Sequence, residues 1–269
     1  MSLPKRAANF IFDLLFPIKC LGCGAELENE IPQKRWICPD CLGKIDLRKE
    51  QVCPVCEKES EGGRTHYACR KETALDGLWA SSWYDSKLIA EAIHKFKFNF
   101  IKDLSFPLAH VMERSLLGAN ELTDIHDLLL SGFSKMPGEE NIYVEETKNR
   151  ISETVIIPVP LHRKRYNWRG FNQSYLLSSR LAEKFKISAS DKLLAKRKNT
   201  KPQTQLSARE DRKANIKGAF YCPDASLVVG KNFVVVDDVC TTLSTLNECA
   251  LELKKAKAKN IWGLVIARR

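Results

Sequence analysis

The chain lacks an apolar run long enough to cross a membrane as a helix. The apolar stretch at residues 10–16 contains Asp13 and is followed by Pro17, whereas a spanning helix needs roughly 20 residues. The small-residue cleavage site of a secretory signal is also missing. We interpret the stretch as a short amphipathic helix that packs on its own protein, with contact to a membrane surface as the lesser alternative. The sequence therefore predicts a cytoplasmic protein with no stable membrane span, in which cysteines are reduced or bound to metal.

Acidic residues are comparatively few. The 33 Asp and Glu residues stand against 43 Lys and Arg residues, which gives a formal net charge of +10. An excess of positive charge favours a polyanionic partner or an anionic substrate. The alternative is a solvated basic surface that has no such partner.

Cysteine, in contrast, is abundant and regularly spaced. Seven of the ten cysteines lie between residues 20 and 69. A Cys-x2-Cys turn lets two thiolates grip one metal ion, and two such turns complete the tetrahedral shell that Zn²⁺ prefers. Four paired turns within about fifty residues are hard to obtain by chance. The predicted zinc ligands are Cys20, Cys23, Cys38, Cys41, Cys53, Cys56, His66 and Cys69.

Sequential pairing of these turns predicts two structural zinc sites, one from residues 20–41 and one from residues 53–69. A cross-braced pairing and disulfides are the alternatives, and His66 is the ligand that the spacing supports least. Closed ligand shells leave no open position for zinc catalysis. The basic surface of such a module contacts nucleic acid or protein in one interpretation; in the other the module only packs on its neighbour.

A buried strand followed by two acids organises the rest of the chain. Residues 233–236 read Phe-Val-Val-Val, a pattern typical of a strand buried on both faces of a parallel sheet. Asp237 and Asp238 follow, and then a turn rich in hydroxyl residues leads into a helical pattern at 246–253. Hydroxyls and a helix N-terminus favour a phosphate, while the acids suit sugar hydroxyls or a metal ion. The stretch therefore predicts a site for a sugar phosphate.

A second anion site is predicted after residues 154–157, another buried strand. A Pro-Val-Pro turn follows it, and then a burst of cationic side chains at residues 162–169. Open α/β sheets bind ligands at the carboxyl ends of their strands. Farther along, residues 193–195 and 218–220 are predicted as short strands on either side of a basic, mobile loop at 196–206.

Strand and helix patterns alternate over the last two thirds of the chain, which predicts an α/β fold with a mostly parallel sheet. Four phenylalanines in the middle of the chain are predicted to lie in the core, with neighbouring lysines as a rim. Residues 118–153 form an irregular excursion with one short helix at 124–130. The other expected elements are strands at 75–85 and 261–267 and helices at 86–96 and 102–117; the phenylalanines are Phe96, Phe98, Phe100 and Phe106.

The turn after the buried strand resembles the ribose-5-phosphate signature of type I phosphoribosyltransferases. More narrowly, the chain resembles the ComF family of competence-associated, phosphoribosyltransferase-like proteins over nearly its whole length, except about residues 118–153. Besides the cysteine turns, the matching blocks are residues 158–174, residues 200–220 and the run Val236-Asp237-Asp238-Val239-x-Thr241-Thr242-x-Ser244-Thr245.

This resemblance implies a helix and double zinc ribbon in residues 1–72, followed by a type I phosphoribosyltransferase-like domain in residues 73–269. Asp237 and Asp238 would meet the ribose hydroxyls of phosphoribosyl pyrophosphate, and residues 200–212 would form a flexible loop over the site. By position, the 5′-phosphate turn would comprise Thr241, Thr242, Leu243, Ser244 and Thr245, and the pyrophosphate loop Leu161 and His162, with Arg163 and Arg169 near the leaving group.

The implied reaction is transfer of the pentosyl group to an unknown acceptor, with pyrophosphate displaced from C1 of the ribose and its charge stabilised by Mg²⁺ and basic side chains. It needs no protein nucleophile, so the lack of a catalytic triad does not oppose it. Leu243 departs from the family, which usually has Gly there. Because Gly permits a positive φ, Leu243 is predicted to strain the turn or crowd the phosphate.

The alternative function is a non-catalytic factor that binds nucleic acid during DNA uptake. It would bind single-stranded DNA together with the competence machinery and use the fold as a ligand sensor or a structural module. A salvage phosphoribosyltransferase for a free base is a third interpretation, disfavoured because such an enzyme has no need of zinc ribbons.

Overall fold

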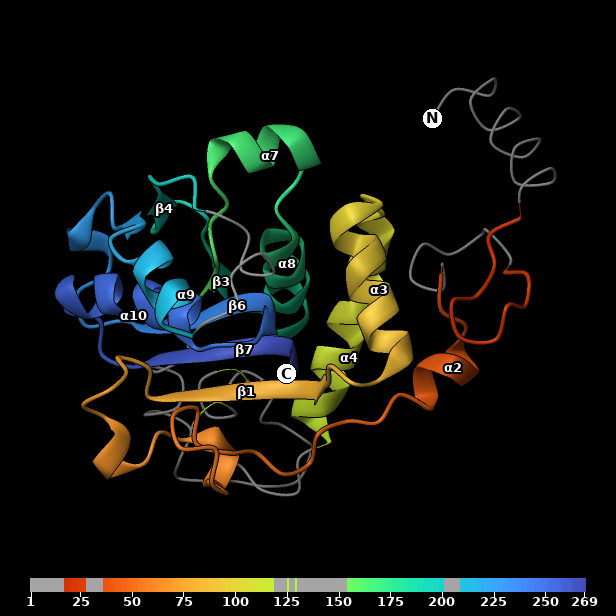
Figure 1. Ribbon diagram of the computed structural model, residues 1–269, viewed down its shortest axis with the longest axis horizontal. Helices are drawn as coiled ribbons and strands as arrows, with labels where there is room; N and C mark the ends of the chain where they lie inside the picture. The colour runs from red at the N-terminus through yellow and green to blue at the C-terminus, as the bar shows by residue number, and fades with distance from the viewer. Residues whose placement is uncertain (1–16, 28–35, 119–124, 126–128, 130–153, 201–208) are drawn as a thin grey trace.

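The computed structural model describes residues 17–27, 36–118, 125, 129, 154–200 and 209–269 (Figure 1). The expected N-terminal helix therefore lies outside the described residues, as do most of the excursion and residues 201–208 of the expected loop. Within the described part of the chain, no helix has the length and apolar character of a membrane span.

Five strands form one parallel sheet in the order β1-β7-β6-β2-β3. The central strand β6 carries the Phe-Val-Val-Val run, and all four of these side chains are fully buried. The α/β fold with a mostly parallel sheet is thus confirmed. The strands are β1 (Gly77–Trp83), β2 (Thr154–Pro158), β3 (Ser188–Ala189), β6 (Asn232–Cys240) and β7 (Ile261–Arg268).

Helices cover both faces of the sheet. Successive β6 side chains point to opposite faces, so neighbouring residues of this strand pack against different helices. Val234 and Val236 pack in one core cluster with α3 (Lys87–Phe98), α4 (Ser105–Leu117) and α8 (Gln173–Phe185). Phe233 and Val235 pack in a second cluster with α10 (Ser244–Lys255). Shorter helices are α2 (Pro39–Gly43), α7 (Arg163–Arg169) and α9 (Arg209–Ile216), with 3₁₀ turns η2 (Glu61–Gly63), η3 (Tyr67–Cys69), η4 (Lys102–Leu104) and η6 (Ala225–Leu227).

The two short strands around the basic loop do not join the main sheet. β4 (Ala195–Lys196) pairs antiparallel with β5 (Phe220–Tyr221) as a separate ribbon. Phe220 is fully buried in the cluster that α10 also shares. This ribbon therefore covers the α10 side of the molecule and leaves the parallel sheet uninterrupted.

The cysteine-rich segment runs along the edge strand β1, as the orange trace in Figure 1 shows. Arg48 N donates to Ser81 O at 3.0 Å, and the Gln51 side chain bonds both backbone groups of Ala80 at 3.1 Å. An uncovered edge strand would offer unpaired backbone groups to other chains. Ile37 and Ile45 also lie in the core cluster of α3 and α4. The cysteine-rich segment is thus packed on the sheet and its helices. The predicted domain boundary between residues 72 and 73 stays a prediction.

Two of the four phenylalanines predicted as core are on the surface. Phe96 is fully buried and Phe106 half-buried, but Phe98 is 45% exposed and Phe100 38% exposed. Phe98 lies in the last turn of α3 on the face away from the sheet. Phe100 follows the helix with a left-handed φ of 58°. The helical period of the pattern therefore ends at Phe96, and the later aromatic residues are not part of the core stripe.

Candidate functional site

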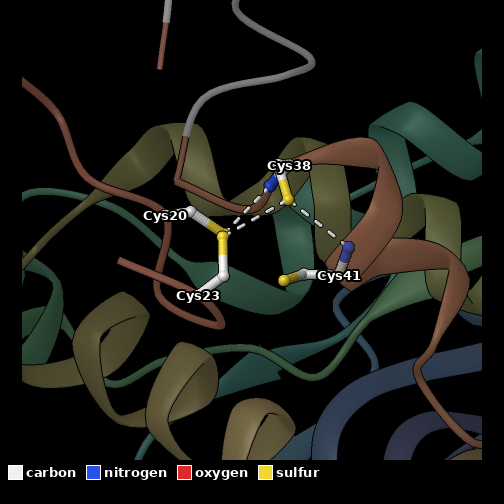
Figure 2. Close-up of side chains that lie close together, drawn as sticks. All are labelled: Cys20, Cys23, Cys38 and Cys41. Atoms are coloured by element: carbon white, nitrogen blue, oxygen red, sulfur yellow. Dashed lines mark hydrogen bonds between the residues drawn. The ribbon is translucent and has the colours of Figure 1, made fainter. Parts of the chain in front are cut away.

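The first cysteine cluster brings Cys20, Cys23, Cys38 and Cys41 together (Figure 2). Their sulfur atoms all lie within 4.8 Å of one another, and Cys23 Sγ is 3.8 Å from Cys38 Sγ. A tetrahedron with Zn–S bonds of about 2.3 Å has S···S edges of about 3.8 Å. The four thiols therefore fit one zinc ion.

Local structure places these thiols and stabilises their charged form. Cys38 caps the N-terminus of α2, and its sulfur accepts from Cys41 N at 3.4 Å. Cys20 Sγ accepts from Cys38 N at 3.2 Å and from Gly22 N at 3.4 Å. Burial acts to raise the pKa of Cys20, but these backbone N–H donors outweigh it and lower the pKa to about 6. Such N–H···S bonds are the outer shell that orients metal-bound thiolates.

The second cluster joins Cys53, Cys56, His66 and Cys69 with the same 4.8 Å limit between ligand atoms. His66 Nδ1 lies 3.3 Å from Cys56 Sγ. On its other side, His66 Nε2 lies 3.1 Å from the carbonyl oxygen of Glu59. A carbonyl can only accept, so Nε2 carries the proton and Nδ1 is left with a lone pair for zinc. This bond gives His66 a specific role that its spacing alone did not establish.

The structure selects among the pairings that the sequence left open. Each cluster is built from two consecutive turns, which confirms sequential pairing and excludes the cross-braced arrangement. All ten cysteines lie in the described residues and all are free thiols, so the disulfide alternative is wrong for this structure. The first site offers four thiolates to its metal ion, and the second offers three thiolates and one imidazole.

Replacing His66 tests this assignment. We expect His66→Cys to retain zinc, because a thiolate also completes a tetrahedral shell. His66→Ala should lower the zinc content of the purified protein from two ions per chain toward one, measured by mass spectrometry of the metal. His110→Ala is the matched control, since His110 is exposed and its Nδ1 lies 3.3 Å from Glu113 Oε2, outside both cysteine clusters. Retention of both ions in His66→Ala would contradict ligation by His66.

The acid pair lies in strand β6, as the sequence predicted, and the strand continues two residues beyond Asp238 to Cys240. Asp237 Oδ1 accepts from Ser174 Oγ and from Asp238 N, each at 2.9 Å. Asp238 is 6% exposed. Burial, reinforced by the neighbouring Asp238 carboxylate, raises the pKa of Asp237 to about 7. Asp238 is thus buried and Asp237 half-buried, and the two acids differ in their partners.

Cationic groups from three other elements interact electrostatically with the pair. Lys97 Nζ, from α3, lies 2.7 Å from Asp238 Oδ1. Burial lowers the pKa of Arg169, in α7, while the Asp238 carboxylate opposes that shift. Arg169 Nε is buried and has no hydrogen-bond partner among the described residues. Burial likewise lowers the pKa of Lys196, in β4, to about 8; the charge of Arg165 adds to this, and Asp237 opposes it.

The hydroxyl turn after β6 leads directly into α10, as predicted. Thr242 Oγ1 donates to Ser244 Oγ at 3.2 Å, and Ser244 is the first residue of the helix. Thr241, Leu243 and Thr245 are partly exposed around it. Free N–H groups and a partial positive charge are characteristic of such a helix start. The turn therefore has the donors that a phosphate needs.

Leu243 does not strain this turn. Its φ and ψ of −55° and −5° are right-handed helical values, which any L-residue adopts. The side chain packs against the core cluster beneath α10. The prediction of backbone strain at Leu243 is thus wrong, because the residue serves as the N-cap of a helix and a positive φ is not needed there.

The predicted pyrophosphate loop forms a turn and the helix α7. The His162 side chain caps the start of α7 by accepting from Lys164 N at 3.2 Å. Leu161 is half-buried, and Arg163 is exposed on the first turn of the helix. Asn172 caps the following helix α8, with its side chain accepting from Ser174 N at 3.1 Å. Of this group, Arg169 is the residue whose charge interacts with the acid pair; the roles of Leu161, His162 and Arg163 stay predictions.

Three residues near the acids were not predicted as site residues: Lys97, Ser174 and Lys196. Lys97 and Lys196 are far from the acid motif in sequence, and only the packing of α3 and β4 brings them close. Ser174 reaches Asp237 from the first turn of α8. A single signal was available for Lys97, namely its place in a Lys- and Phe-rich run. Arg165, from the predicted cationic burst at 162–169, donates from Nη2 to Thr200 O at 2.6 Å.

Comparison with known proteins agrees with this architecture. Residues 11–70 match the Double zinc ribbon domain family. The chain is 30% identical over 253 residues to "Competence protein F" of Haemophilus influenzae, covering 86% of this chain and 96% of that protein. It is 35% identical to "DNA utilization protein YhgH" of Escherichia coli, covering 87% and 97%. It is 22% identical to "Competence protein ComFC" of Bacillus subtilis, covering 91% and 94%.

Fold and sites together define a double zinc ribbon protein whose ribbons are packed on an α/β domain with an acid pair on its central strand. The chain belongs to the ComF family of competence proteins, since its relatives match it over nearly their full length.

Proposed function

We propose that the acid pair and the hydroxyl turn bind phosphoribosyl pyrophosphate in a protein that acts in competence or DNA utilization. The observation that supports this most is the placing of Asp237 and Asp238 before a phosphate-type turn and among cations from α3, α7 and β4. The acids would accept from the ribose 2′- and 3′-hydroxyls. Thr241, Thr242, Ser244 and Thr245 would hold the 5′-phosphate.

The leaving pyrophosphate would meet the basic side chains. The Nε of Arg169 is a hydrogen-bond donor without a partner among the described residues, and its burial shields it from water. Lys196 is a second partly buried cation with a lowered pKa. Buried donors aimed at developing charge are worth more than solvated ones. We propose pentosyl transfer to an unknown acceptor on this basis.

Mg²⁺ would accompany the pyrophosphate. Carboxylate and phosphate oxygens are the ligands that Mg²⁺ takes, and Asp237 and Asp238 supply such oxygens. When bound, the ion would offset the charge of the leaving group. The chain's own residues orient the ribose and hold the anions.

Calorimetry with phosphoribosyl pyrophosphate tests the proposed ligand. We use zinc-replete, full-length protein, with and without Mg²⁺, and ribose 5-phosphate as the ligand that lacks the pyrophosphate. Binding of the first ligand and weaker binding of the second would support the proposal. If neither ligand gives a heat of binding with protein that retains its zinc, the proposed ligand is wrong.

The raised pKa of Asp237 predicts a pH-dependent stability. The folded state keeps the proton up to about pH 7, whereas an unfolded Asp loses it near pH ~4. Between these values the folded protein binds more protons, so its stability falls as pH rises, by on the order of 1–3 kcal/mol in total. Urea unfolding from pH 5.5 to 8 should show this fall in the wild type and a flatter profile in Asp237→Asn. Equal slopes in the two proteins would show that Asp237 titrates normally.

A second candidate function is binding of nucleic acid. It is favoured by the formal net charge of +10 and by relatives named for competence and DNA utilization. We propose that the protein is cytoplasmic. Free thiols are typical of that compartment, and Cys222, Cys240 and Cys249 are free thiols outside the zinc sites. Binding to single-stranded DNA should weaken steeply with salt if phosphate contacts dominate. A flat salt response would count against this function.

A further inference from the structure

Three aromatic side chains form one exposed surface at the end of α3 and on α7. Trp168 is 62% exposed, Phe98 45% and Phe100 38%. The Phe100 and Trp168 rings meet edge to face, with centroids 5.0 Å apart and an interplanar angle of 84°. The guanidinium carbon of Arg169 lies 5.9 Å from the Phe98 ring and 5.9 Å from the Trp168 ring. We refer to Phe98, Phe100 and Trp168 as the aromatic surface.

The backbone at Phe100 supports a role for this surface outside the fold. Its φ of 58° is rare for a bulky side chain and costs on the order of 1–3 kcal/mol. The conformation holds a large apolar ring partly in water against Trp168. Neither the strain nor the exposure is offset by burial in the core. Strained residues of this kind cluster where a protein binds something.

The charges around the aromatic surface select the kind of partner. Helix α7 reads Arg-Lys-Arg-Tyr-Asn-Trp-Arg and contains no acidic residue. Arg163 and Lys164 on it are exposed. Lys102, between α3 and α4, is also exposed, and its Nζ lies 5.5 Å from the ring of Phe171. The nearby Asp238 is already paired with Lys97. Exposed aromatic rings beside solvated cations match a chain that has both planar rings and phosphates.

We propose that the aromatic surface stacks unpaired bases of single-stranded DNA, while Arg163 and Lys164 contact the phosphates. This inference deepens the second candidate function and rests on it. It places the single-stranded DNA on α3 and α7 and not on the zinc ribbons. Arg169 contacts the aromatic surface and also interacts with Asp238, so the bound DNA would lie beside the sugar-phosphate site.

Fluorescence anisotropy with a labelled oligo-thymidine tests the proposal. Trp168→Ala and Phe100→Ala should each weaken binding by about tenfold, within the range for loss of one stacking partner. The salt dependence should keep its slope, because neither change removes a cation. Trp168→Phe should restore most of the affinity. A duplex of the same length should bind more weakly than the single strand, since its bases are already stacked on one another.

Trp83→Ala is the matched control. Trp83 is 43% exposed and has the guanidinium carbon of Arg48 at 4.2 Å from its ring centroid. Like Trp168 with Arg169, it pairs an exposed aromatic ring with a guanidinium. Trp83 precedes α3, whereas Phe98 is in the last turn of this 12-residue helix, which is about 18 Å long. We expect Trp83→Ala to bind the oligonucleotide as the wild type does.

Two failures can be told apart. If wild-type protein binds no single strand at low salt, the nucleic-acid function and this inference are both wrong. If the wild type binds but Trp168→Ala and Phe100→Ala bind equally well, only the inference is overturned, and the surface is then assigned to a protein partner. Equal binding of duplex and single strand would also overturn it. Neither outcome bears on binding of phosphoribosyl pyrophosphate.

Discussion

Removal of zinc is expected to unfold the cysteine-rich segment while leaving the parallel sheet formed. The segment's apolar residues, such as Ile37, Ile45 and Leu47, pack on the main core cluster and form no cluster of their own among the described residues. Metal binding supplies about 10–16 kcal/mol to zinc-ribbon-sized folds, which is comparable to the stability of a typical whole domain, about 5–15 kcal/mol. Hydrogen exchange after chelation should therefore show loss of protection at the amides of Cys38, Cys41 and His66, which bond thiolates.

The same experiment has a consequence for the sheet. Without the segment that holds Arg48 and Gln51, the backbone of β1 at Ala80 and Ser81 loses its partners. An exposed, apolar edge strand pairs with other chains. We expect the zinc-free protein to form oligomers or aggregates at concentrations where the zinc-bound protein does not, measured by light scattering.

Single substitutions separate the two ions. Cys20→Ser should remove one zinc ion per chain, and Cys53→Ser should remove the other. Cys222→Ser is the control, because Cys222 is a half-exposed thiol outside both clusters and should leave two ions in place. Full zinc content in Cys20→Ser, or protection at His66 that survives chelation, would contradict a metal-dependent fold.

The zinc ligands could be predicted from the sequence because they are local. Each Cys-x2-Cys turn places two ligands without any help from the rest of the fold, so spacing indicated the cysteine ligands directly and His66 least. What spacing could not decide was the pairing, since sequential and cross-braced arrangements use identical turns. The hydrogen bond from His66 to Glu59 O depends on a turn geometry that no residue pattern specifies.

The acid-pair site was predictable only in the part that one strand and its turn contribute. Asp237, Asp238 and the hydroxyl turn are contiguous, whereas Lys97 lies far upstream in the sequence and reaches Asp238 through the packing of α3 on the sheet. The prediction for Leu243 failed for a related reason. A family preference for Gly at this position suggested a positive φ, but the backbone here already has helical values.

The aromatic residues after α3 show the limit of pattern reasoning most clearly. Phe96, Phe98 and Phe100 alternate with lysines, and hydrophobicity alone places all three in the core. Helical period puts Phe96 on the buried face and Phe98 on the other side. The turn at Phe100 then fixes a side chain beside Trp168, which is far away in the sequence. A contact of this kind depends on where α7 packs.

Replacement of Asp238 by Asn is expected to weaken binding of phosphoribosyl pyrophosphate by about 10- to 100-fold. Asn keeps the shape of Asp but has no charge, and one of its two terminal groups is an NH₂ that donates, so the charged hydrogen bond to the ribose hydroxyl is lost. A hydrogen bond to a charged group contributes about 1.5–3 kcal/mol. The corresponding loss of affinity is measured by calorimetry with Mg²⁺ present.

The fold should tolerate this change. Asp238→Asn leaves Lys97 without its carboxylate partner, but 24% of the Lys97 side chain is exposed, so its ammonium can reach water. The change also removes the like charge next to Asp237, which contributes to the raised pKa of that residue. We therefore expect a cooperative unfolding transition close to that of the wild type, and a lower pKa of Asp237.

Two further variants make the result specific. Asp191→Asn is the matched control, because Asp191 is exposed and carries the same charge; it should bind the ligand as the wild type does. Lys97→Met in the Asp238→Asn background should lower the affinity less than it does alone, because the two residues form one ion pair. If Asp238→Asn binds the ligand as tightly as the wild type, while its unfolding transition is intact, the acids do not hold the ribose and the proposed site is wrong.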